Sequence, residues 1–513
     1  MAPDVYGAPF EGPEKLLEVW FAPSAHAVPG ADSARDGKFG LRSVPRAVWE
    51  EMLDIVKCKV LSVVQGIEVD AYLLSESSLF VSPHRLILKT CGTTLNLLGL
   101  PRILDIAAAR ANLTAVYRLF YSRKSFMFPE RQQGPHRGWD EEVRFLDNIF
   151  ANGSAYTVGR TNGDHWLLYM VGPQEDQGSS SASGSPSIPP RILSHNHHHH
   201  HLHAAPAIDA PPHPLHAGDC TIEILMTHLS PAARAPFFFG DAAEPSDAAP
   251  SAPFDQAHAL QESIGITSLF PAHLTTLDAY AFSPCGYSSN ALLKWGSAAS
   301  SSSSTPNFDG TGGEGYYTIH VTPEEGWSYA SFECNVPLPY RPSGSSAVDD
   351  AHAMPDLQTL VRRVVDIFQP GHITLTMFVS CADSATAEEE EDESAVEAAQ
   401  RAFKAALTRP QSAGAQPRAN EKREEPPASP SILTRFWSSL PLPFASADKS
   451  PAEPRAVAAP GIDIPVKEEV AGPSEVIAEE KAPASWGRLY RRTDKINYEF
   501  RGYDLAFASF ELR

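Results

Sequence analysis

Residues 74–94 read LSESSLFVSPHRLILKTCGTT and form the most informative stretch of the chain. Two apolar runs rich in Leu, Ile, Val and Phe, typical of β-strands, flank a Ser-Pro-His turn. Ser75, Ser77 and Ser78 interrupt the first run, and an arbitrary Ser-Glu-Ser-Ser would be a β-bulge or a turn. No G-x-S-x-G motif surrounds these serines, and the chain has no CxxC, HExxH or Walker sequence.

The sequence on both sides of this stretch alternates between helix and strand patterns. Residues 46–58 (RAVWEEMLDIVKC) have helical spacing, whereas the Asn-Gly pair at 162–163 between two apolar runs is typical of a β-hairpin. The tripeptide Asp-Ala-Tyr opens similar stretches at 70–72 and 278–280, which hints at duplicated halves. The pattern predicts an α+β fold of antiparallel sheets, each covered by helices on one face.

The composition of the 513-residue chain predicts one large folded unit interrupted by disordered inserts. The chain has 33 Gly and 45 Pro, and several stretches of mostly Ala, Ser, Pro and Glu cannot bury enough apolar area to offset their chain entropy. The inserts expected on this basis are 172–217, 241–253, 296–313, 337–351 and 382–484. The last insert contains SAVEAAQRAFKAALTR, whose pattern is that of an isolated helix.

Charge and cysteine content argue against several classes of protein. The chain has 41 basic and 62 acidic residues and a net charge of −21, which disfavours binding to nucleic-acid phosphates. No stretch reaches 18 apolar residues, so no membrane span is expected, and the N-terminal MAPDVYGAPFEG lacks the pattern of a secretory signal. Six cysteines without paired spacing fit a reducing cytosol, which predicts a cytoplasmic protein.

Seven motifs follow one another along the chain in a specific order. FEGPEKLLEVWF comes first, and YLLSESSLFVS with ILKTCGTT comes second. The others are FYSRKSFMFP, PHRGWDEEVRFLDNIF, SPCGYSSNAL, YYTIHVTPEEGWSYASFECN and VVDIFQPGHITLTMF. In sequence and order they resemble the eukaryotic S-adenosylmethionine decarboxylase proenzymes. The resemblance implies one domain over residues 1–513, folded as a four-layer α/β/β/α sandwich of two antiparallel sheets from duplicated halves, with the active site at one edge.

The resemblance implies that the chain cleaves itself between Glu76 and Ser77. The Ser77 hydroxyl would attack the Glu76 carbonyl, and the resulting ester would break down to leave a pyruvoyl group. Ser288 corresponds to the residue that stabilises the intermediate, and His320 to the base that removes the α-proton. Taken alone, His320 would be interpreted as a structural histidine of a sheet. The two products would be a β chain, 1–76, and an α chain, 77–513.

The implied cofactor is this pyruvoyl group, which forms a Schiff base with S-adenosylmethionine and accepts electrons as carbon dioxide leaves. Cys91 corresponds to the proton donor, although a lone strand cysteine is usually a small buried hydrophobe. Without the resemblance, Glu14 and Glu18 would belong to a solvated first helical turn. The remaining implied site residues are the acids Glu11 and Glu14, the adenine-stacking rings Phe10 and Phe282, and Glu324 on the ribose hydroxyls.

A second implied ligand is putrescine, a dication that activates animal and fungal members of the family. Buried carboxylates without a counter-charge are costly, so a cationic ligand is a reasonable partner for them. Plant members place an arginine where this chain has Leu16, and the apolar residue therefore favours the diamine-responsive type. The implied site consists of the acids Asp219, Glu223 and Glu333 with the aromatic walls Phe120, Phe378 and Tyr503.

Two other functions stay open. An inactive relative that activates a catalytic partner would be expected to lose processing or catalytic residues, whereas Ser77, Cys91, Ser288 and His320 are all present. A metal-handling role would depend on the histidine run at 197–203 alone, and no metal is expected at the active site. The expected partners are S-adenosylmethionine, putrescine and the two cleaved chains, which leaves dimerisation undecided.

Overall fold

The computed structural model describes twelve ranges of the chain: residues 9–31, 37–75, 77–172, 191–192, 213–214, 219–239, 251–296, 312–340, 353–380, 394–408, 489–500 and 502–513. They all belong to one compact unit, residues 1–410 with 487–513. The other unit, residues 411–486, lies outside the described residues. No helix in the described ranges is both long and apolar enough to cross a bilayer.

The first half of the chain forms an eight-stranded sheet in the order β2-β3-β4-β5-β1-β6-β8-β7. Every neighbouring pair is antiparallel, as the hairpin-rich sequence predicts. The strands are β1 Lys15–Trp20, β2 Val60–Gln65, β3 Asp70–Leu74, β4 Ser77–Val81, β5 Arg85–Thr90, β6 Arg118–Lys124, β7 Gly153–Gly159 and β8 His165–Val171.

The second half repeats this topology. Its sheet has the order β12-β13-β14-β15-β11-β17-β19-β18, with the short β9 (Arg191–Ile192) added at the edge. Numbered within each half, both sheets follow the same order, 2-3-4-5-1-6-8-7, which confirms the prediction of duplicated halves. The strands are β11 Cys220–Thr227, β12 Thr275–Ala281, β13 Tyr287–Gly296, β14 Gly312–Thr322, β15 Tyr329–Cys334, β17 His372–Ser380, β18 Tyr490–Phe500 and β19 Tyr503–Leu512.

The Asp-Ala-Tyr repeat does not mark equivalent positions of the two halves. Asp70 begins β3, the second strand in its sheet order, whereas Asp278 lies in β12, the first strand of the other sheet. The similarity of 70–72 and 278–280 is therefore coincidental, although the duplication that it suggested is real.

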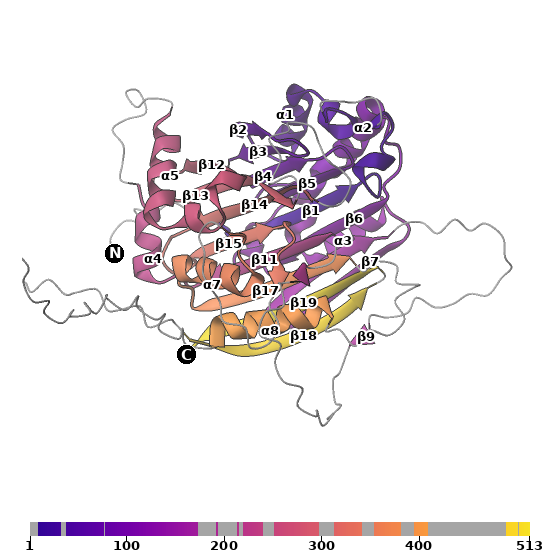
Figure 1. Cartoon of the computed structure of the whole chain (residues 1–513). Coiled ribbons are helices and arrows are strands. Elements are labelled where there is room, and N and C mark those ends of the chain that lie inside the picture. The colour runs from indigo at the N-terminus through magenta and orange to yellow at the C-terminus, as the bar shows by residue number, and fades with distance from the viewer. Residues whose placement is uncertain are drawn as a thin grey trace, which may run out of the picture. The chain divides into compact units, whose positions relative to one another are not determined.

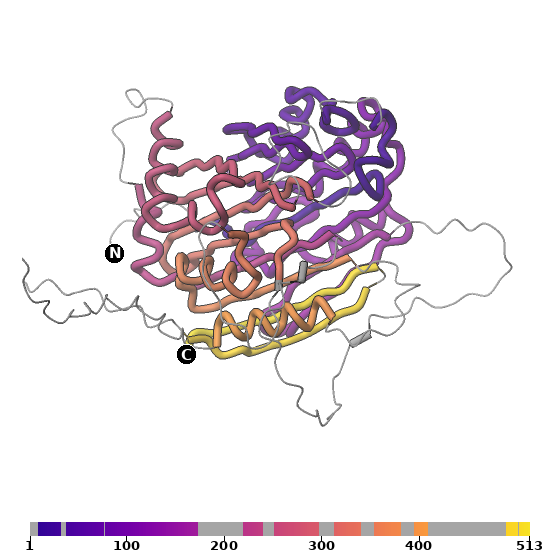
Figure 2. Tube along the Cα trace, in the orientation of Figure 1, coloured from indigo at the N-terminus to yellow at the C-terminus, as the bar shows by residue number. Residues whose placement is uncertain are grey.

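Helices cover the outer face of each sheet, which gives the four layers visible in Figures 1 and 2. On the first sheet these are α1 Arg46–Ile55, α2 Leu100–Ala111 and α3 Trp139–Asp147. On the second sheet they are α4 Pro231–Arg234, α5 Ala252–Ser263, α7 Leu357–Phe368 and α8 Ala395–Thr408. Each helix–sheet interface has its own apolar core, and the two sheets face each other in the middle.

Helix α7 shows how the sequence sets these outer layers. Asp356 caps its first turn by accepting a hydrogen bond from the Thr359 amide at 2.8 Å. Leu357, Leu360 and Val364 follow at helical spacing and are all buried against the second sheet. The helix ends at Gln369, whose φ of 44° is left-handed.

The sequence SAVEAAQRAFKAALTR forms a packed helix instead of the isolated one that was predicted. Helix α8 lies against α7 and the strands β17, β18 and β19, and Phe403 is fully buried. Its apolar stripe needs a partner, and the strand β18, which the sequence reasoning did not identify, helps to provide that partner. This part of the expected insert 382–484 therefore belongs to the core of the second half.

The other expected inserts fall largely on residues outside the described ranges, and so does the histidine run at 197–203. Within them the structure shows three short strands: β9 pairs with β18, and β10 His213–Pro214 pairs with β16 Pro339–Tyr340. The disorder expected for these segments stays a prediction.

Candidate active site

A hydrogen-bonded cluster joins the two sheets at β4 and centres on Ser78. The Ser78 hydroxyl donates to Asn290 Oδ1 at 2.6 Å, and it lies 3.0 Å from both Thr318 Oγ1 and His320 Nε2. Asn290 lies on β13, and Thr318 and His320 lie on β14. Residues more than 200 positions apart are thus brought into one polar site between the sheets.

The directions of these hydrogen bonds fix the tautomer of His320. Ser78 gives its proton to Asn290, and Thr318 gives its proton to the Ser289 carbonyl at 2.9 Å. Since neither hydroxyl has a second proton, Nε2 of His320 must donate to them and Nδ1 must accept. Ser288 Oγ lies 2.9 Å from Nδ1 and is the donor to it. Burial, followed by the charge of Lys89, lowers the pKa of His320 to about 3, so the ring is neutral at pH 7.

Ser77 lies on the opposite face of β4 from Ser78, because successive strand residues point to opposite faces. It is fully buried, and its hydroxyl is 3.8 Å from the Cys58 thiol. Of the serines in the predicted cleavage motif, Ser78 therefore contacts His320 directly. Glu76 lies outside the described residues.

A cavity of about 320 Å³ opens beside this cluster, where β5 and β14 end and β13 begins. The predicted proton donor Cys91 shares it with Ser288 and His320. The predicted rings Phe10 and Phe282 also line the cavity, together with Glu324, whose pKa is raised by burial. The structure thus brings six of the predicted site residues to one cavity, whereas Ser77, Glu11 and Glu14 do not line it.

Glu11 and Glu14 precede β1, Glu18 lies within it, and all three are buried, so the alternative of a solvated helical turn for Glu14 and Glu18 is wrong. Glu11 accepts hydrogen bonds from the Met127 and Phe128 amides, both at 2.7 Å. Burial raises the pKa of Glu11 and of Glu14. Gly12 permits this close packing, because a Cβ there would lie 2.6 Å from a Tyr329 carbon.

Glu14 belongs to a buried ionic layer between the sheets. Its carboxylate accepts hydrogen bonds from Ser331 and, at 2.6 Å, from Tyr329. Lys89 Nζ lies 2.6 Å from Glu333 and 3.8 Å from Glu223, and all three groups are buried. These contacts place the predicted diamine acids Glu223 and Glu333 around an internal lysine.

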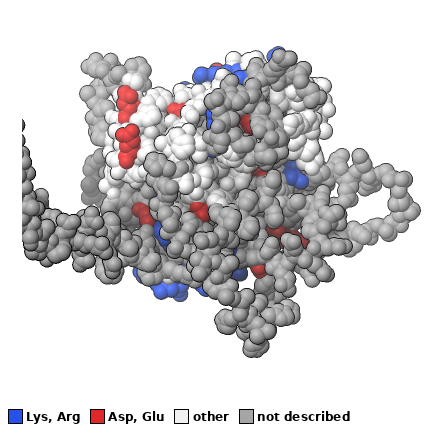
Figure 3. Space-filling model, in the orientation of Figure 1, with Lys and Arg blue, Asp and Glu red and all other residues white. Residues whose placement is uncertain are grey.

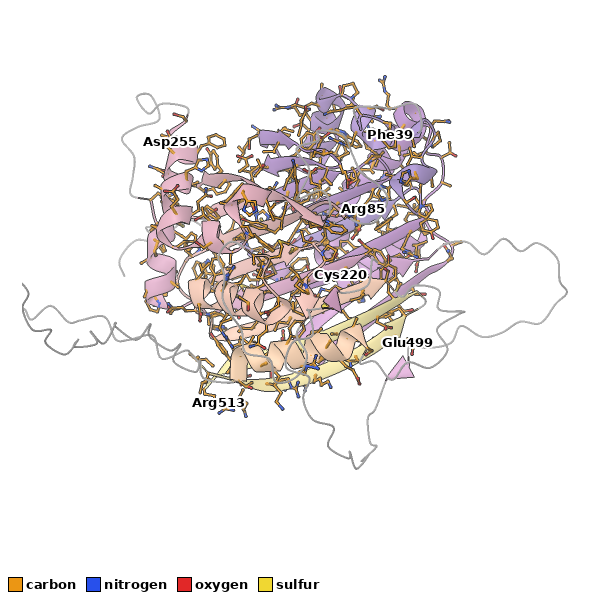
Figure 4. The ribbon with its side chains drawn as sticks, viewed as in Figure 1. Phe39, Arg85, Cys220, Asp255, Glu499 and Arg513 are labelled. Carbon is orange, nitrogen blue, oxygen red and sulfur yellow. The ribbon has the colours of Figure 1, made fainter. Side chains whose placement is uncertain are left out.

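Arg85 forms the second cationic centre of this layer, and Figure 4 shows it well inside the molecule. It pairs with Asp219 at 2.8 Å and with Glu18 at 3.2 Å. Five acidic side chains, those of Glu14, Glu18, Asp219, Glu223 and Glu333, therefore share two bases, Lys89 and Arg85. Burial raises the pKa of Glu18 and of Glu223 to about 7. The neighbouring base lowers each pKa and the neighbouring acids raise it.

The predicted aromatic walls pack together beside the ionic layer. Phe378 stacks on Tyr503 with ring centroids 4.6 Å apart, and Phe120 meets both rings edge-on at 5.1 Å. Leu16 packs in a separate apolar cluster with Phe80 and lies between the sheets.

A second cavity, of about 390 Å³, opens at the opposite ends of the same strands. Arg85, Asp219 and Tyr503 line it, together with Trp20 and Trp295. On the face drawn in Figure 3, the charged side chains of the described residues are scattered. In these residues no group of three or more His, Cys, Asp or Glu side chains could hold a metal ion.

Asn290, Ser78 and Thr318 are the members of the cluster that the sequence reasoning missed. Asn290 lies two residues after Ser288, and Thr318 lies two residues before His320. Since strand residues two apart share a face, that spacing was a signal that could have found both.

Comparisons with known proteins agree on one family. A family model described as adenosylmethionine decarboxylase matches residues 7–407. An S-adenosylmethionine decarboxylase proenzyme of Xenopus laevis is 36% identical over 72% of this chain and 83% of its own length. Proteins of the same name from Saccharomyces cerevisiae and Drosophila melanogaster are each 34% identical over 72% of this chain, and over 82% and 83% of their own lengths. A crystal structure of the Trypanosoma brucei AdoMetDC-delta26 monomer covers 85% of this chain and 99% of its own, with 16% identity and a TM-score of 0.38. These values are too low to add to the assignment.

Proposed function

The chain belongs to the adenosylmethionine decarboxylase family, and from that premise we propose which of its residues perform the cleavage and the decarboxylation. It is the proenzyme of a pyruvoyl-dependent enzyme that decarboxylates S-adenosylmethionine for polyamine synthesis. The observation that carries the residue assignment is that His320 contacts both Ser288 and Ser78, the residue that follows Ser77 in the chain.

Processing begins when the Ser77 hydroxyl attacks the Glu76 carbonyl carbon. The new C–O bond forms, the peptide C–N bond breaks, and the nitrogen of residue 77 becomes an amine. Ser288 turns its one hydroxyl proton from His320 Nδ1 to the oxygen that becomes negative during attack, which leaves Nδ1 able to accept a proton. His320 then removes the α-proton of residue 77, and the Glu76 carboxylate leaves. Addition of water and loss of ammonia complete the pyruvoyl group.

The residues around position 77 fit a pyruvoyl group. Ser77 is the first residue of β4 and lies opposite Thr90, the residue before Cys91. The backbone of residue 77 therefore lies close to Cys91, but the Ser77 side chain faces Cys58, so the group formed there would have to turn toward the cavity that Cys91, Ser288 and His320 line. Its carbonyl supplies the electron sink for decarboxylation.

The chain's own residues bind the substrate and move one proton. Phe10 and Phe282 stack on adenine and lie near the sulfonium, where a cation–π contact contributes about 0.5–2 kcal/mol. Glu324 accepts hydrogen bonds from the ribose hydroxyls, and Glu11 and Glu14 supply negative charge close to the reacting centre. The Cys91 thiol gives its proton to the substrate α-carbon after carbon dioxide has left.

Putrescine is the proposed activator, and the ionic layer supports this assignment. Its acids outnumber its bases, and a dication would reduce that imbalance between Glu18, Asp219 and Glu223. The rings of Phe120, Phe378 and Tyr503 would cover the methylene chain of the diamine.

The two cleaved chains stay together in this proposal. Strand β3 of the short chain pairs with β4 of the long chain from Asp70 to Leu74, and β1 pairs on both sides. A cytoplasmic location is proposed because none of the five cysteines that the structure describes forms a disulfide.

Denaturing electrophoresis with intact-mass measurement tests the cleavage site. The wild type is expected to give chains of residues 1–76 and 77–513, whereas Ser77→Ala should stay a single chain and be inactive. Ser78→Ala is the matched control, because it removes the neighbouring hydroxyl and one hydrogen bond of His320. It should cleave more slowly at the same bond. Cleavage of Ser77→Ala at position 77 would overturn the assignment.

A further inference from the structure

A buried polar cluster lies behind the first sheet, on the face that α3 covers, and takes no part in the chemistry above. Arg123, His136, Tyr121 and Glu142 are all buried. Glu142 accepts two hydrogen bonds from Arg123 Nε, at 2.8 and 3.1 Å, and one from Tyr121 at 2.6 Å. His136 Nδ1 lies 2.8 Å from Glu142 and donates to it, because Nε2 accepts from a backbone amide. The Glu142 charge is therefore already balanced by Arg123.

Lys15 is the unbalanced member of this region. Its side chain is fully buried, and its Nζ donates to the Gly92 carbonyl at 2.9 Å. The Phe126 ring centroid is 5.3 Å from Nζ. Lys15 makes no ion pair within 4.0 Å to any residue that the structure describes. A buried ammonium that has no carboxylate within ion-pair distance is costly. The position of Lys15 therefore calls for a function.

Gly92 is the residue after Cys91, and its backbone is fixed from three sides. Its carbonyl accepts hydrogen bonds from Lys15 and, at 3.3 Å, from Gln132. Its amide donates to the Glu11 carbonyl at 2.9 Å. Its φ of 62° is left-handed, and a Cβ there would meet the Phe10 ring at 3.2 Å. The proposed donor is thus held in a turn that only glycine fits well.

The charge on Lys15 also acts on Cys91. Burial lowers the pKa of Lys15 to about 8, and a negative charge on Cys91, present only when it is a thiolate, opposes this most. The ammonium is therefore largely protonated at pH 7. The other charged groups that face it are Glu11, Glu142 and Arg123.

We propose that Lys15 is a positioning residue that holds the Cys91–Gly92 turn and places a positive charge beside the Cys91 thiol. The inference rests on the proposed role of Cys91. When the S–H bond breaks and the C–H bond of the product forms, the sulfur keeps the electron pair. A fixed ammonium stabilises that thiolate until solvent returns a proton.

Lys15→Met and Gln132→Met form a matched pair for the test. Both remove one donor to the Gly92 carbonyl, but only the first removes a charge. In processed Lys15→Met, kcat should fall about 10- to 100-fold with KM little changed, less than the loss of the donor itself. The pH midpoint for alkylation of Cys91 by iodoacetamide should rise by about one pH unit. Gln132→Met should keep the wild-type midpoint.

An unchanged alkylation midpoint in folded Lys15→Met would overturn the proposal. If Lys15→Met does not fold or process, Lys15→Arg provides the measurement. This variant retains the charge and should therefore keep the wild-type alkylation midpoint. A midpoint raised by one pH unit would contradict the inference. Failure of the proposed function has a different signature, because full turnover by Cys91→Ala would remove Cys91 as the donor whatever its alkylation midpoint is.

Discussion

The outer layers of this enzyme are apolar, whereas its middle layer combines apolar clusters with buried charged and polar groups. Between helices and sheets lie two large apolar cores, with residues such as Trp49 and Phe368 fully buried. Between the sheets lie buried lysine, arginine and glutamate side chains and the cluster around Ser78. An apolar middle layer would be at least as stable. The comparison teaches that the outer layers suffice to maintain the fold, and it agrees with our proposal that the charges between the sheets serve the chemistry.

Cys91→Ala should produce the largest effect, and only on the reaction. Because the thiol takes no part in the serine chemistry, the variant should still split at Ser77. Loss of a positioned proton donor should lower kcat by about 10²–10⁴-fold. The measurements are electrophoresis for processing and release of carbon dioxide for turnover. Near-normal turnover would show that another group supplies the proton.

Phe368→Ala tests the outer layer and should have the reverse signature. Phe368 is fully buried in the core beneath α7, so its truncation should lower the free energy of unfolding by about 3–5 kcal/mol. Turnover per folded molecule should be unchanged below the melting transition. The control is Phe238→Ala, since Phe238 is 41% exposed and should tolerate truncation. Equal destabilisation of both variants would weaken the contrast between the layers.

Putrescine should stabilise the enzyme more at pH 8 than at pH 5.5. The pKa of Glu18 and of Glu223 is raised from 4.5 to about 7, so the folded chain binds more protons than the unfolded chain in this window. Without putrescine, the free energy of unfolding therefore falls as pH rises from about 4.5 to 7. A bound dication should offset this loss, because it compensates the negative charge of the ionised carboxylates. Thermal melting with and without putrescine at both pH values measures this effect.

Asp219→Asn is the variant that separates the diamine site from a general salt effect. Putrescine should stimulate the wild type and should tighten its substrate binding by about 5- to 150-fold, a coupling of roughly 1–3 kcal/mol, and the variant should lose that response. An equal response in both proteins would remove Asp219 from the site. No response in either protein would show that the diamine switch is absent.

Asp356→Ala should have the smallest effect, because it removes only the cap of α7. The expected loss is about 1 kcal/mol of unfolding free energy, and Asp356→Asn should retain most of it. Urea denaturation of both variants checks this, and activity should not change.

The outer layers could be predicted from sequence because they depend on local periodicity. The spacing of apolar residues in α1 and α7, and the alternation of the hairpins, follow from residues close together in the chain. The exceptions were α8 and β18, which support each other across the long interval between 408 and 489. Neither element has a local signal that reveals its partner.

The middle layer could be predicted only through resemblance. Ser78 and His320 meet across 242 positions, and Lys89 meets Glu333 across 244. No periodicity links such pairs. The sequence also could not show that Lys89 and Arg85 form ion pairs with the acids assigned to the diamine. Both bases lie in β5, whose sequence has no feature that indicates these partners.

The described strands of residues 1–76 lie both inside their sheet and at its edge: β1 lies between β5 and β6, whereas β2 is the edge strand and pairs with β3. Three strands that follow Ser77, namely β4, β5 and β6, therefore pair with the short chain. In the proposed mechanism cleavage needs Ser288 and His320 from the other sheet, and it would therefore follow assembly of the two halves. A cut chain is then a lasting record that its molecule once reached the native state. The fraction of cut chains in a sample counts past folding events, even after the protein has been denatured.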